Sequence, residues 1–296
     1  MTPVANAGVK VAAALEWQTD RVRRWRRRVL RRRRAEDIHR LRVALRRLRV
    51  AIRLARMVIH LPPDASEGTA GAAASSLGKV RDSAVARAAL LELRLTTRGN
   101  DAVTIERLVS RVERRERGRF DRARQWLRRG RVRRLLLGLR RILRRPLVRP
   151  LGSQPLPEAR ATLLAPAWAA VVDHPAWALP AGVDDFPVGP DRLRHDLRIR
   201  IKELRDTLEL LAETPTADRL LIDELNALST ILGEIRDLVK LRAHLGDSAP
   251  SLRRTVTSRL DRAAGRWDTL RGEWLAGSVV RAGLPAVGGS IPNHGS

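Results

Sequence analysis

The sequence predicts an all-α protein. Long stretches of its 296 residues are rich in Arg, Leu and Ala, and their apolar positions recur at spacings of three and four, as in amphipathic helices. The chain has no Tyr and two Phe, and no run alternates apolar and polar residues for more than a few positions, so strands are not expected. The spacing predicts helices at residues 9–33, 36–58, 68–95, 103–127, 131–143, 191–213, 217–245 and 251–275.

Prolines and glycines separate two helical halves. Nine Pro and three Gly lie between residues 146 and 190, where they would break any long helix repeatedly, although apolar residues among them indicate a short packed helix. The last residues are rich in Gly and Pro and indicate a flexible tail. The predicted organisation is an N-terminal helical half (1–145), a Pro-rich connection with a short helix (146–190), a C-terminal helical half (191–284) and a flexible tail (285–296).

The charge of the chain indicates a polyanionic partner. Lys and Arg number 59 against 32 Asp and Glu, a formal net charge of +27, and all but four of the basic residues are arginines. Guanidinium groups bind phosphate in a planar, two-pronged way that ammonium groups cannot match. A basic protein of this kind is expected to bind nucleic acid, an anionic membrane surface or a polymeric phosphate.

Several classes of protein are not expected. The chain has no Cys, which excludes disulfides, thiolate nucleophiles and Cys-based zinc sites. Neither a secretory signal nor an uncharged apolar stretch of about 18 residues is visible, so a cytoplasmic location without a membrane span is predicted. The chain also lacks a Gly-rich phosphate loop and a Gly-x-Ser-x-Gly elbow, and no enzymatic activity is predicted.

The second half of the chain repeats motifs of the first in the same order. The first motif, His39-x-x-Arg42-Val43-x-x-Arg46-x-Leu48-Arg49, returns 156 residues later as His195-x-x-Arg198-Ile199-x-x-Lys202-x-Leu204-Arg205. The second, Leu77-Gly78-Lys79-Val80-Arg81-Asp82, returns 155 residues later as Leu232-Gly233-Glu234-Ile235-Arg236-Asp237. A third pair centres on Trp126 and Trp274. These matches predict two tandem four-helix bundles related by a pseudo-twofold axis.

Basic residues follow one face of the predicted helix 36–58. Positions 39, 42, 46, 49 and 53 fall within an arc of about 80°, beside an apolar stripe, and extend for roughly 21 Å. Like charges at this spacing cost about 0.2–0.5 kcal/mol per pair, and no acid lies within the stripe. A solvated face is the alternative interpretation, but the stripe recurs in the second half. The predicted polyanion site pairs the two stripes as walls of a basic groove or pore: His39, Arg42, Arg46, Arg49, Arg53, His195, Arg198, Lys202 and Arg205.

Other residues of the repeats receive supporting roles. Neighbouring positive charge should lower the pKa of His39 and His195, so that each can donate a hydrogen bond to phosphate while largely neutral. Asp82 and Asp237 are predicted to be structural, each pairing with a basic residue. Gly78 and Gly233 suggest close helix packing. Predicted secondary polyanion contacts are Arg47, Lys79, Arg81, Arg236, Arg114 and Arg262.

Two further features of the sequence bear on what the chain binds. Glu36-x-x-His39 has the spacing of a di-iron ligand pair, but Arg192 stands where the second half would need the matching acid, so neither a metal nor a cofactor is predicted. The run Arg21 to Arg34 contains ten arginines and has no counterpart in the second half. We interpret this run as an outer polyanion surface that supplements a site.

The two repeated motifs together resemble the CHAD family, the conserved histidine α-helical domain, over residues 9–284. The resemblance implies two four-helix bundles around a central basic pore or cleft, and binding of inorganic polyphosphate, often at polyphosphate granules. The polyphosphate site that the resemblance implies would use the stripe residues named above. Arg47 and Arg53 are weaker candidates for this site, because Glu203 and Glu209 occupy the equivalent positions in the second half. The triphosphate-tunnel domain often joined to such domains has a Glu-x-Glu-x-Lys strand motif, which is absent here.

The predicted function is therefore non-catalytic binding of inorganic polyphosphate, with targeting to polyphosphate granules in the cytoplasm. The alternative is a basic helical protein associated with nucleic acid, for which the net charge and the arginine run are the arguments. Nucleic-acid readers usually add aromatic stacking platforms, and seven scattered Trp with no Tyr give that alternative weak support. A phosphate-processing enzyme with an unrecognised site is a third hypothesis.

Overall fold

The fold is all-α, as predicted. A computed structural model describes residues 5–63, 65–179, 188–214, 216, 218–246 and 249–277. In this part of the chain the backbone forms helices, with two isolated bridges at Asn6–Pro155 and Ile59–Val148. The helices are α1 (Ala7–Arg31), α2 (Ala35–Val58), α3 (Glu67–Thr96), α4 (Gly99–Arg128), α5 (Gly130–Leu143), α6 (Pro150–Ser153), α7 (Leu156–Val172), the 3-10 helix η1 (Pro175–Ala178), α8 (Val188–Leu211), α9 (Arg219–Leu245) and α10 (Pro250–Leu275).

Local signals explain where several helices begin. The hydroxyl of Ser66 accepts a hydrogen bond from the backbone N–H of Gly68 and caps α3. Glu36 and Asp37 occupy the first turn of α2, where carboxylates interact favourably with the positive end of the helix dipole. Pro250 opens α10 at a position where its missing N–H costs nothing. These signals can be recognised without the fold, which is why the predicted helix boundaries lie close to the observed ones.

The Pro-rich connection forms a longer helix than predicted. Instead of a short helix, α7 runs for 17 residues with Pro157 in its first turn and Pro166 inside it. A proline in the first turn is tolerated because its N–H would have no partner within the helix. The interior Pro166 removes one hydrogen bond, but burial of side chains such as Leu163 and Leu164 in the core compensates for that loss. The predicted tail (285–296) and part of the connection lie outside the described residues.

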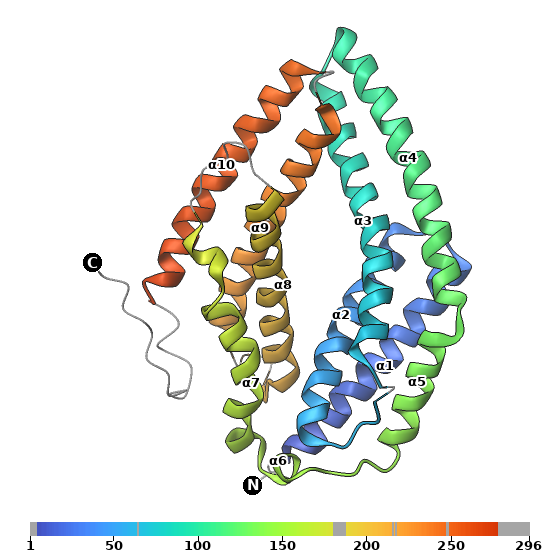
Figure 1. Cartoon of the computed structure of the whole chain (residues 1–296), viewed down its shortest axis with the longest axis vertical. Coiled ribbons are helices and arrows are strands. Elements are labelled where there is room, and N and C mark those ends of the chain that lie inside the picture. Colours follow the sequence, from blue (N-terminus) through green and yellow to red (C-terminus); the bar gives the residue numbers. More distant parts are fainter. Residues whose placement is uncertain are drawn as a thin grey trace.

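The helices enclose a central space between two apolar clusters. Helices α2 and α8 contact each other in the middle of the molecule, while the α3–α4 and α9–α10 hairpins converge at one end (Figure 1). The large core joins α1, α2, α7 and α8, and a second cluster forms where the hairpins meet, with Leu90, Ile105, Leu241 and Val256 among its members. No helix in the described ranges is both long enough and apolar enough to cross a membrane.

Stacked tryptophans attach the connection to α10. Trp177 of η1 stacks on Trp267, with ring centroids 5.5 Å apart, and on Trp274, at 5.9 Å. Arg271 of α10 donates hydrogen bonds from Nη1 to the carbonyl oxygens of Trp177, at 3.0 Å, and Leu179, at 2.6 Å. Buried stacked rings contribute packing well beyond their area, so α10 is held firmly beside the central space.

Candidate polyanion-binding site

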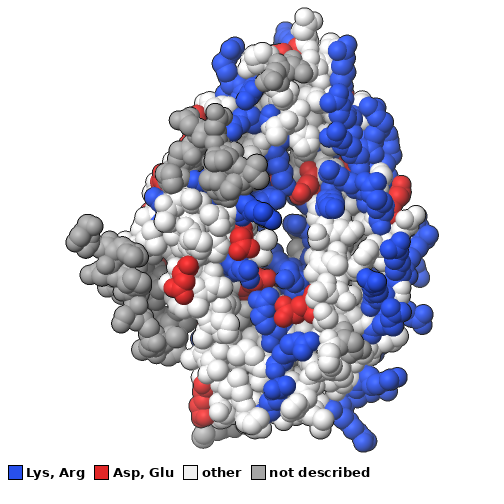
Figure 2. Space-filling view, in the orientation of Figure 1, with Lys and Arg blue, Asp and Glu red and all other residues white. Residues whose placement is uncertain are grey.

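A basic cavity of about 1180 Å³ occupies the space between the two halves. Residues of α2, α3, α8, α9 and α10 line it, and the space-filling view shows a hollow near the middle of the molecule bordered by Lys and Arg, with a few acids among them (Figure 2). The basic lining consists of His39, Arg46, Arg198, Lys202, Arg205, Arg259, Arg262 and Arg266. Three acids, Glu92, Glu234 and Asp237, also line it. The lining therefore has a marked excess of positive charge.

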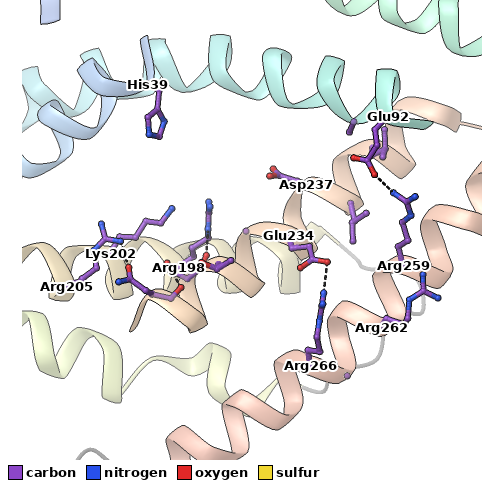
Figure 3. A pocket seen from close by; sticks show the side chains of 18 of the residues that line it. His39, Glu92, Arg198, Lys202, Arg205, Glu234, Asp237, Arg259, Arg262 and Arg266 are labelled. Carbon is purple, nitrogen blue, oxygen red and sulfur yellow. Dashed lines mark hydrogen bonds and ion pairs between the residues drawn. The ribbon is translucent and has the colours of Figure 1, made fainter. Parts of the chain in front are cut away.

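The structure brings part of both predicted stripes to this cavity. His39 of α2 faces Arg198 and Lys202 of α8 across the space (Figure 3). Arg42 and His195 are not lining residues, but each lies near one: the charge of Arg42 helps to lower the pKa of His39, and the charge of Arg198 helps to lower the pKa of His195. The two repeated helices thus contribute opposite sides of one cavity.

Three basic side chains of the cavity, Arg262, Arg198 and Lys202, have no acidic partner among the described residues, and of these Arg198 and Lys202 are partly buried. Arg198 donates from Nε to the carbonyl oxygen of Ser229 at 2.9 Å, and neither side chain forms an ion pair with a carboxylate in the described part of the chain. Burial lowers the pKa of Lys202 to about 6, and the charges of Arg198 and Arg46 add to the shift. Burial also lowers the pKa of Arg198, against which the Asp237 carboxylate acts. This crowding of desolvated positive charge would be relieved by a bound anion.

The surroundings lower the pKa of both repeat histidines. Burial lowers the pKa of His195 to about 4, with smaller effects from Arg236 and Arg198. Burial also lowers the pKa of His39, followed by the charge of Arg81. The direction agrees with the prediction, but burial is a larger cause than neighbouring charge. The Nδ1 atom of each ring is buried without a hydrogen-bond partner among the described residues.

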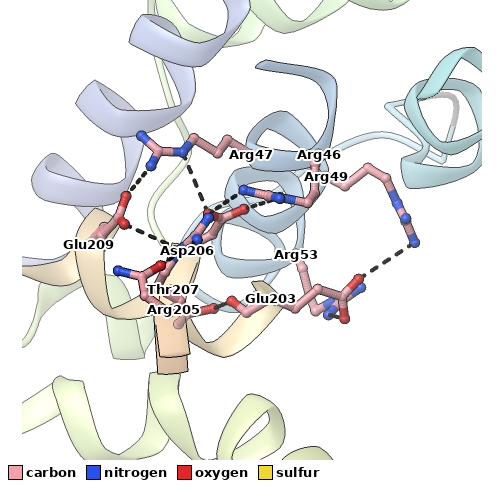
Figure 4. A network of polar contacts seen from close by, with 10 residues as sticks. Arg46, Arg47, Arg49, Arg53, Glu203, Arg205, Asp206, Thr207 and Glu209 are labelled. Carbon is pink, nitrogen blue, oxygen red and sulfur yellow. Dashed lines mark hydrogen bonds and ion pairs between the residues drawn. The ribbon is translucent and has the colours of Figure 1, made fainter. Parts of the chain in front are cut away.

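The expectation that the α2 stripe lacks compensating acids is wrong, because its partners come from α8. Arg46 donates from Nε and Nη2 to the two carboxylate oxygens of Asp206, at 2.7 and 3.0 Å. Arg47 forms an ion pair with Glu209 and also approaches Asp206 (Figure 4). The Asp206 side chain is fully buried, so these contacts are screened little by water.

The far end of the α2 stripe is paired as well. Arg53 lies 3.1 Å from Glu203 and 2.9 Å from Glu67, while Arg49 lies 3.8 Å from Glu203 (Figure 4). Burial alone would lower the pKa of Arg53, but the hydrogen bonds that it donates to Glu67 and Glu203 raise it. Arg49 and Arg53 are absent from the cavity lining. These two predicted site residues therefore join helices and do not face the cavity.

The pairs across α2 and α8 are reciprocal. Glu203 is the repeat counterpart of Arg47 (47 + 156 = 203), and Glu209 is the counterpart of Arg53 (53 + 156 = 209). Arg47 pairs with Glu209, and Arg53 pairs with Glu203, so each position contacts the counterpart of the other. Reciprocal contacts of this kind are typical of a twofold-related interface. Glu203 and Glu209 make the α8 wall of the predicted groove less basic than the α2 wall. The same two acids attach α8 to α2.

Helix α10 contributes a row of arginines that the sequence analysis largely missed. Arg259, Arg262 and Arg266 step by three and four along α10, over about 10 Å, and all three line the cavity (Figure 3). Arg259 pairs with Glu92 at 3.2 Å and Arg266 with Glu234 at 2.5 Å. Only Arg262 was predicted, as a secondary contact. The spacing of the row is visible in the sequence, but spacing does not reveal which face of a helix turns inward.

The remaining predicted contacts lie outside the cavity lining. Lys79 and Arg114 are exposed on α3 and α4. Arg81 and Arg236 lie near the repeat histidines, whose pKa values they lower. Neither pair is in direct contact with the central space, so their contribution to binding would be long-range.

The two repeated aspartates differ in their surroundings. Asp82 accepts a hydrogen bond from Lys240 at 2.7 Å, as its predicted pairing requires. The counterpart of Lys240 in the first half is Val85 (240 − 155 = 85), which cannot return the contact. Asp237 accordingly lines the cavity without an ion pair in the described part of the chain.

The acid of the candidate di-iron ligand pair already has a basic partner. Glu36, the acid of the candidate ligand pair, forms an ion pair with Arg40 at 2.5 Å. The described residues contain no group of three or more His, Asp or Glu side chains that could hold an ion.

Gly233 makes room for a side chain and not, as predicted, for close helix packing. A Cβ atom at Gly233 would lie 2.5 Å from Nη2 of Arg198, whereas nothing lies within 4 Å of a Cβ at Gly78.

Gly78→Ala is expected to raise the free energy of unfolding by about 1 kcal/mol, because Ala has the higher helix propensity. Gly233→Ala should gain less or lose stability, because Arg198 must move away from Ser229. Urea denaturation of both variants measures the difference, and equal gains would contradict it.

Comparison with known proteins places this architecture in a family. The CHAD domain family profile matches residues 13–246. The crystal structure of the CHAD domain from the plant Ricinus communis is similar, with a TM-score of 0.62 and 22% identity, covering 95% of this chain and 90% of that one. PptA from Streptomyces chartreusis has a TM-score of 0.70 and 15% identity, covering 92% and 100%. No curated protein matches the chain. On the family match, the chain belongs to the CHAD family.

Proposed function

We propose that this protein binds inorganic polyphosphate in the cavity and does not act on it chemically. The observation that carries the proposal is the pair Arg198 and Lys202, two partly buried basic side chains without acidic partners among the described residues, on a wall that faces His39. Membership of the CHAD family, for which polyphosphate binding is the expected property, supports the same assignment.

The shape and chemistry of the lining favour a linear phosphate chain. Basic side chains from α8 and from the α10 row line the same cavity, so successive phosphates of one chain could contact both. Charge-assisted hydrogen bonds from guanidinium groups suit phosphate oxygens. None of the described residues that line the cavity is Phe, Tyr or Trp, so bases would find no large stacking platform there. Nucleic acid is therefore the competitor that the test must include.

The test is a competition experiment at fixed salt. Labelled long-chain polyphosphate would be bound to the protein and displaced by unlabelled polyphosphate or by duplex DNA, both counted per phosphate. Polyphosphate should be the better competitor. Tighter binding of DNA per phosphate would overturn the proposal. Affinity for either polymer will fall as salt rises, so a single salt concentration must be used throughout.

The absence of catalysis and the cellular location belong to the same proposal. Incubation with polyphosphate and a divalent metal should leave chain length unchanged on a gel, and release of phosphate that Asp82→Ala abolishes would contradict it. A fluorescent fusion should be recruited from the cytoplasm to polyphosphate granules. The Arg198→Gln/Lys202→Gln variant should stay diffuse.

Affinity for polyphosphate is expected to rise as the pH falls from 8 to 6. Lys202 has a pKa of about 6 in the free protein, chiefly through burial. A bound polyanion favours the ammonium form and raises that pKa, so binding takes up a proton in the range just above pH 6. Internal phosphates of the polymer stay ionised over this range.

Titration calorimetry in buffers of different ionisation enthalpy would measure this proton uptake. Lys202→Arg is the control, because its guanidinium is always charged, and its affinity should vary little with pH. An equally steep pH dependence in that variant would show that another group is responsible.

A further inference from the structure

Two arginine runs of the sequence take no part in the cavity. Ten arginines lie between Arg21 and Arg34, and twelve arginines without any Asp or Glu lie between Arg122 and Pro157. The first run forms the second half of α1 and the turn after it, and the second covers the end of α4, α5 and the segment that follows. Neither run contributes a residue to the cavity lining.

The two runs meet where the C-terminal ends of α1 and α4 lie together. Arg26 donates from Nε and Nη2 to the carbonyl oxygen of Leu127, at 3.0 and 2.7 Å. Arg124 donates from Nη2 to the carbonyl oxygen of Leu30 at 2.9 Å. Burial lowers the pKa of Arg26, and the charge of Arg133 on α5 adds to the shift. Each run thus supplies a hydrogen-bond donor to the last carbonyl groups of the other's helix, and the two form one surface.

Most of this surface consists of exposed cations. We call it the outer arginine face, defined as the fifteen arginines within residues 27–34 and 128–145, all of which are exposed. None of them forms an ion pair with an Asp or Glu side chain in the described part of the chain. Figure 2 shows Lys and Arg crowded along the flank where α4 and α5 lie. The repulsion stored in this face is therefore not relieved within the molecule.

The outer arginine face is separate from the cavity. Helix α5 lies on the flank of the molecule away from α10, with α1 and α2 between it and the second half (Figure 1). A short anion bound in the cavity cannot also touch this face. Whatever binds here must be either a second molecule or a distant segment of a long polymer.

The side chains of the outer arginine face favour a ligand made of phosphate groups over a lipid surface or single-stranded nucleic acid. An interfacial helix inserts its apolar side into lipid, but α5 turns Val132, Leu135, Leu136 and Leu139 into the core. Single-stranded nucleic acid needs exposed rings for stacking, whereas Phe120 is buried beneath the guanidinium of Arg33. The exposed arginines alone are sufficient to bind a polymer that presents only phosphate oxygens.

We propose that the outer arginine face binds a second segment of linear polyphosphate, so that one long chain can join several protein molecules. The inference rests on the proposed function of the cavity. A chain held at one site raises the effective concentration of its own remaining segments near the other sites. Long polymers should therefore bind more tightly than short ones and assemble the protein, while short oligophosphates should occupy the cavity only.

The test compares two variants that remove equal charge. The outer variant carries four substitutions on α5: Arg131→Gln, Arg134→Gln, Arg140→Gln and Arg141→Gln. The control variant carries four substitutions at exposed arginines at the start of α4 and along it, which form no ion pair within the described residues: Arg98→Gln, Arg107→Gln, Arg111→Gln and Arg115→Gln. Circular dichroism confirms that both fold.

Salt dependence of binding to long-chain polyphosphate is the first measurement. Each lost phosphate contact should reduce the slope of log K against log salt by about 0.7, so the outer variant should lose up to about 3 and the control much less. Light scattering should show assembly with the long polymer for the wild type and the control only. Equal losses in both variants would mean that bulk charge does the binding, and would overturn the inference.

Two further arms separate the possible failures. A short oligophosphate should bind both variants like the wild type and should fail to bind Arg198→Gln/Lys202→Gln. If that result holds while the outer variant still assembles, the cavity function stands and the outer face is wrong. If duplex DNA displaces polyphosphate from the wild type, and this advantage disappears in the outer variant, the face binds nucleic acid and the inference is overturned.

Discussion

Asp206→Asn is expected to lower the free energy of unfolding by about 3–5 kcal/mol, the usual cost of removing one partner from a buried ion pair. The side chain of Asp206 is fully buried and contacts Arg46, Arg47 and Arg205. An amide occupies the same space but removes the carboxylate that the three guanidinium groups share, so that among the described residues Arg46 keeps no acidic partner and Arg47 and Arg205 keep Glu209 alone. The helices α2 and α8 would then repel each other where they now attach the two halves.

Urea denaturation of the purified variant measures this loss. Asp223→Asn is the matched control, because Asp223 and Arg219 form an exposed pair at 3.9 Å with both side chains more than half exposed. Such a pair contributes about 0–1 kcal/mol, so the control should unfold nearly like the wild type. A similar small effect for Asp206→Asn would show that the network does not hold the halves together.

Arg198→Gln combined with Lys202→Gln is expected to weaken binding of short oligophosphate at least 100-fold. Hydrogen bonds to charged groups contribute roughly 1.5–3 kcal/mol each, and two of them correspond to about two or more orders of magnitude in affinity. Neither residue has an acidic partner in the described part of the chain. The double variant should therefore lose binding with little change in stability, because replacing the partly buried amine of Lys202 should offset the lost hydrogen bond from Arg198 to Ser229.

The matched control is Arg107→Gln with Arg111→Gln. These two arginines have the same i, i+4 spacing on α4 but are exposed and outside the cavity. Fluorescence anisotropy with a labelled oligophosphate should show little change for this pair. If both double variants lose affinity equally, the cavity has no special role and net charge accounts for binding.

Much of the fold could be predicted from local patterns. The positions of the helices follow from apolar spacing and from capping and proline signals, all of which act over a few residues. The sequence predicted a short helix in the connection but not the full length of α7, because Pro166 argues against a helix locally and only burial of Leu163 and Leu164 outweighs it. The outcome there depended on a core that the local sequence does not describe.

The candidate site was only partly predictable. The repeated motifs identified His39, Arg46, Arg198, Lys202 and Arg205, which the structure brings to one cavity. The same reasoning placed Arg49 and Arg53 in that site, although both are paired elsewhere. The repeated motifs did not identify Arg259 and Arg266, which also line the cavity. Spacing gives the face of a helix on which a residue lies, but the neighbour that this face meets is decided by packing.

The sequence by itself determined the helical class, the internal repeat and the excess of arginine, because these are properties of residue type and spacing. Only the tertiary structure decided which arginines are neutralised. Arg47 and Glu209 are 162 residues apart in the chain, and Arg46 and Asp206 are 160 apart. Electrostatic attraction depends on distance in space, so the division of the basic residues into structural pairs, cavity cations and the outer arginine face appears only when the two halves come together.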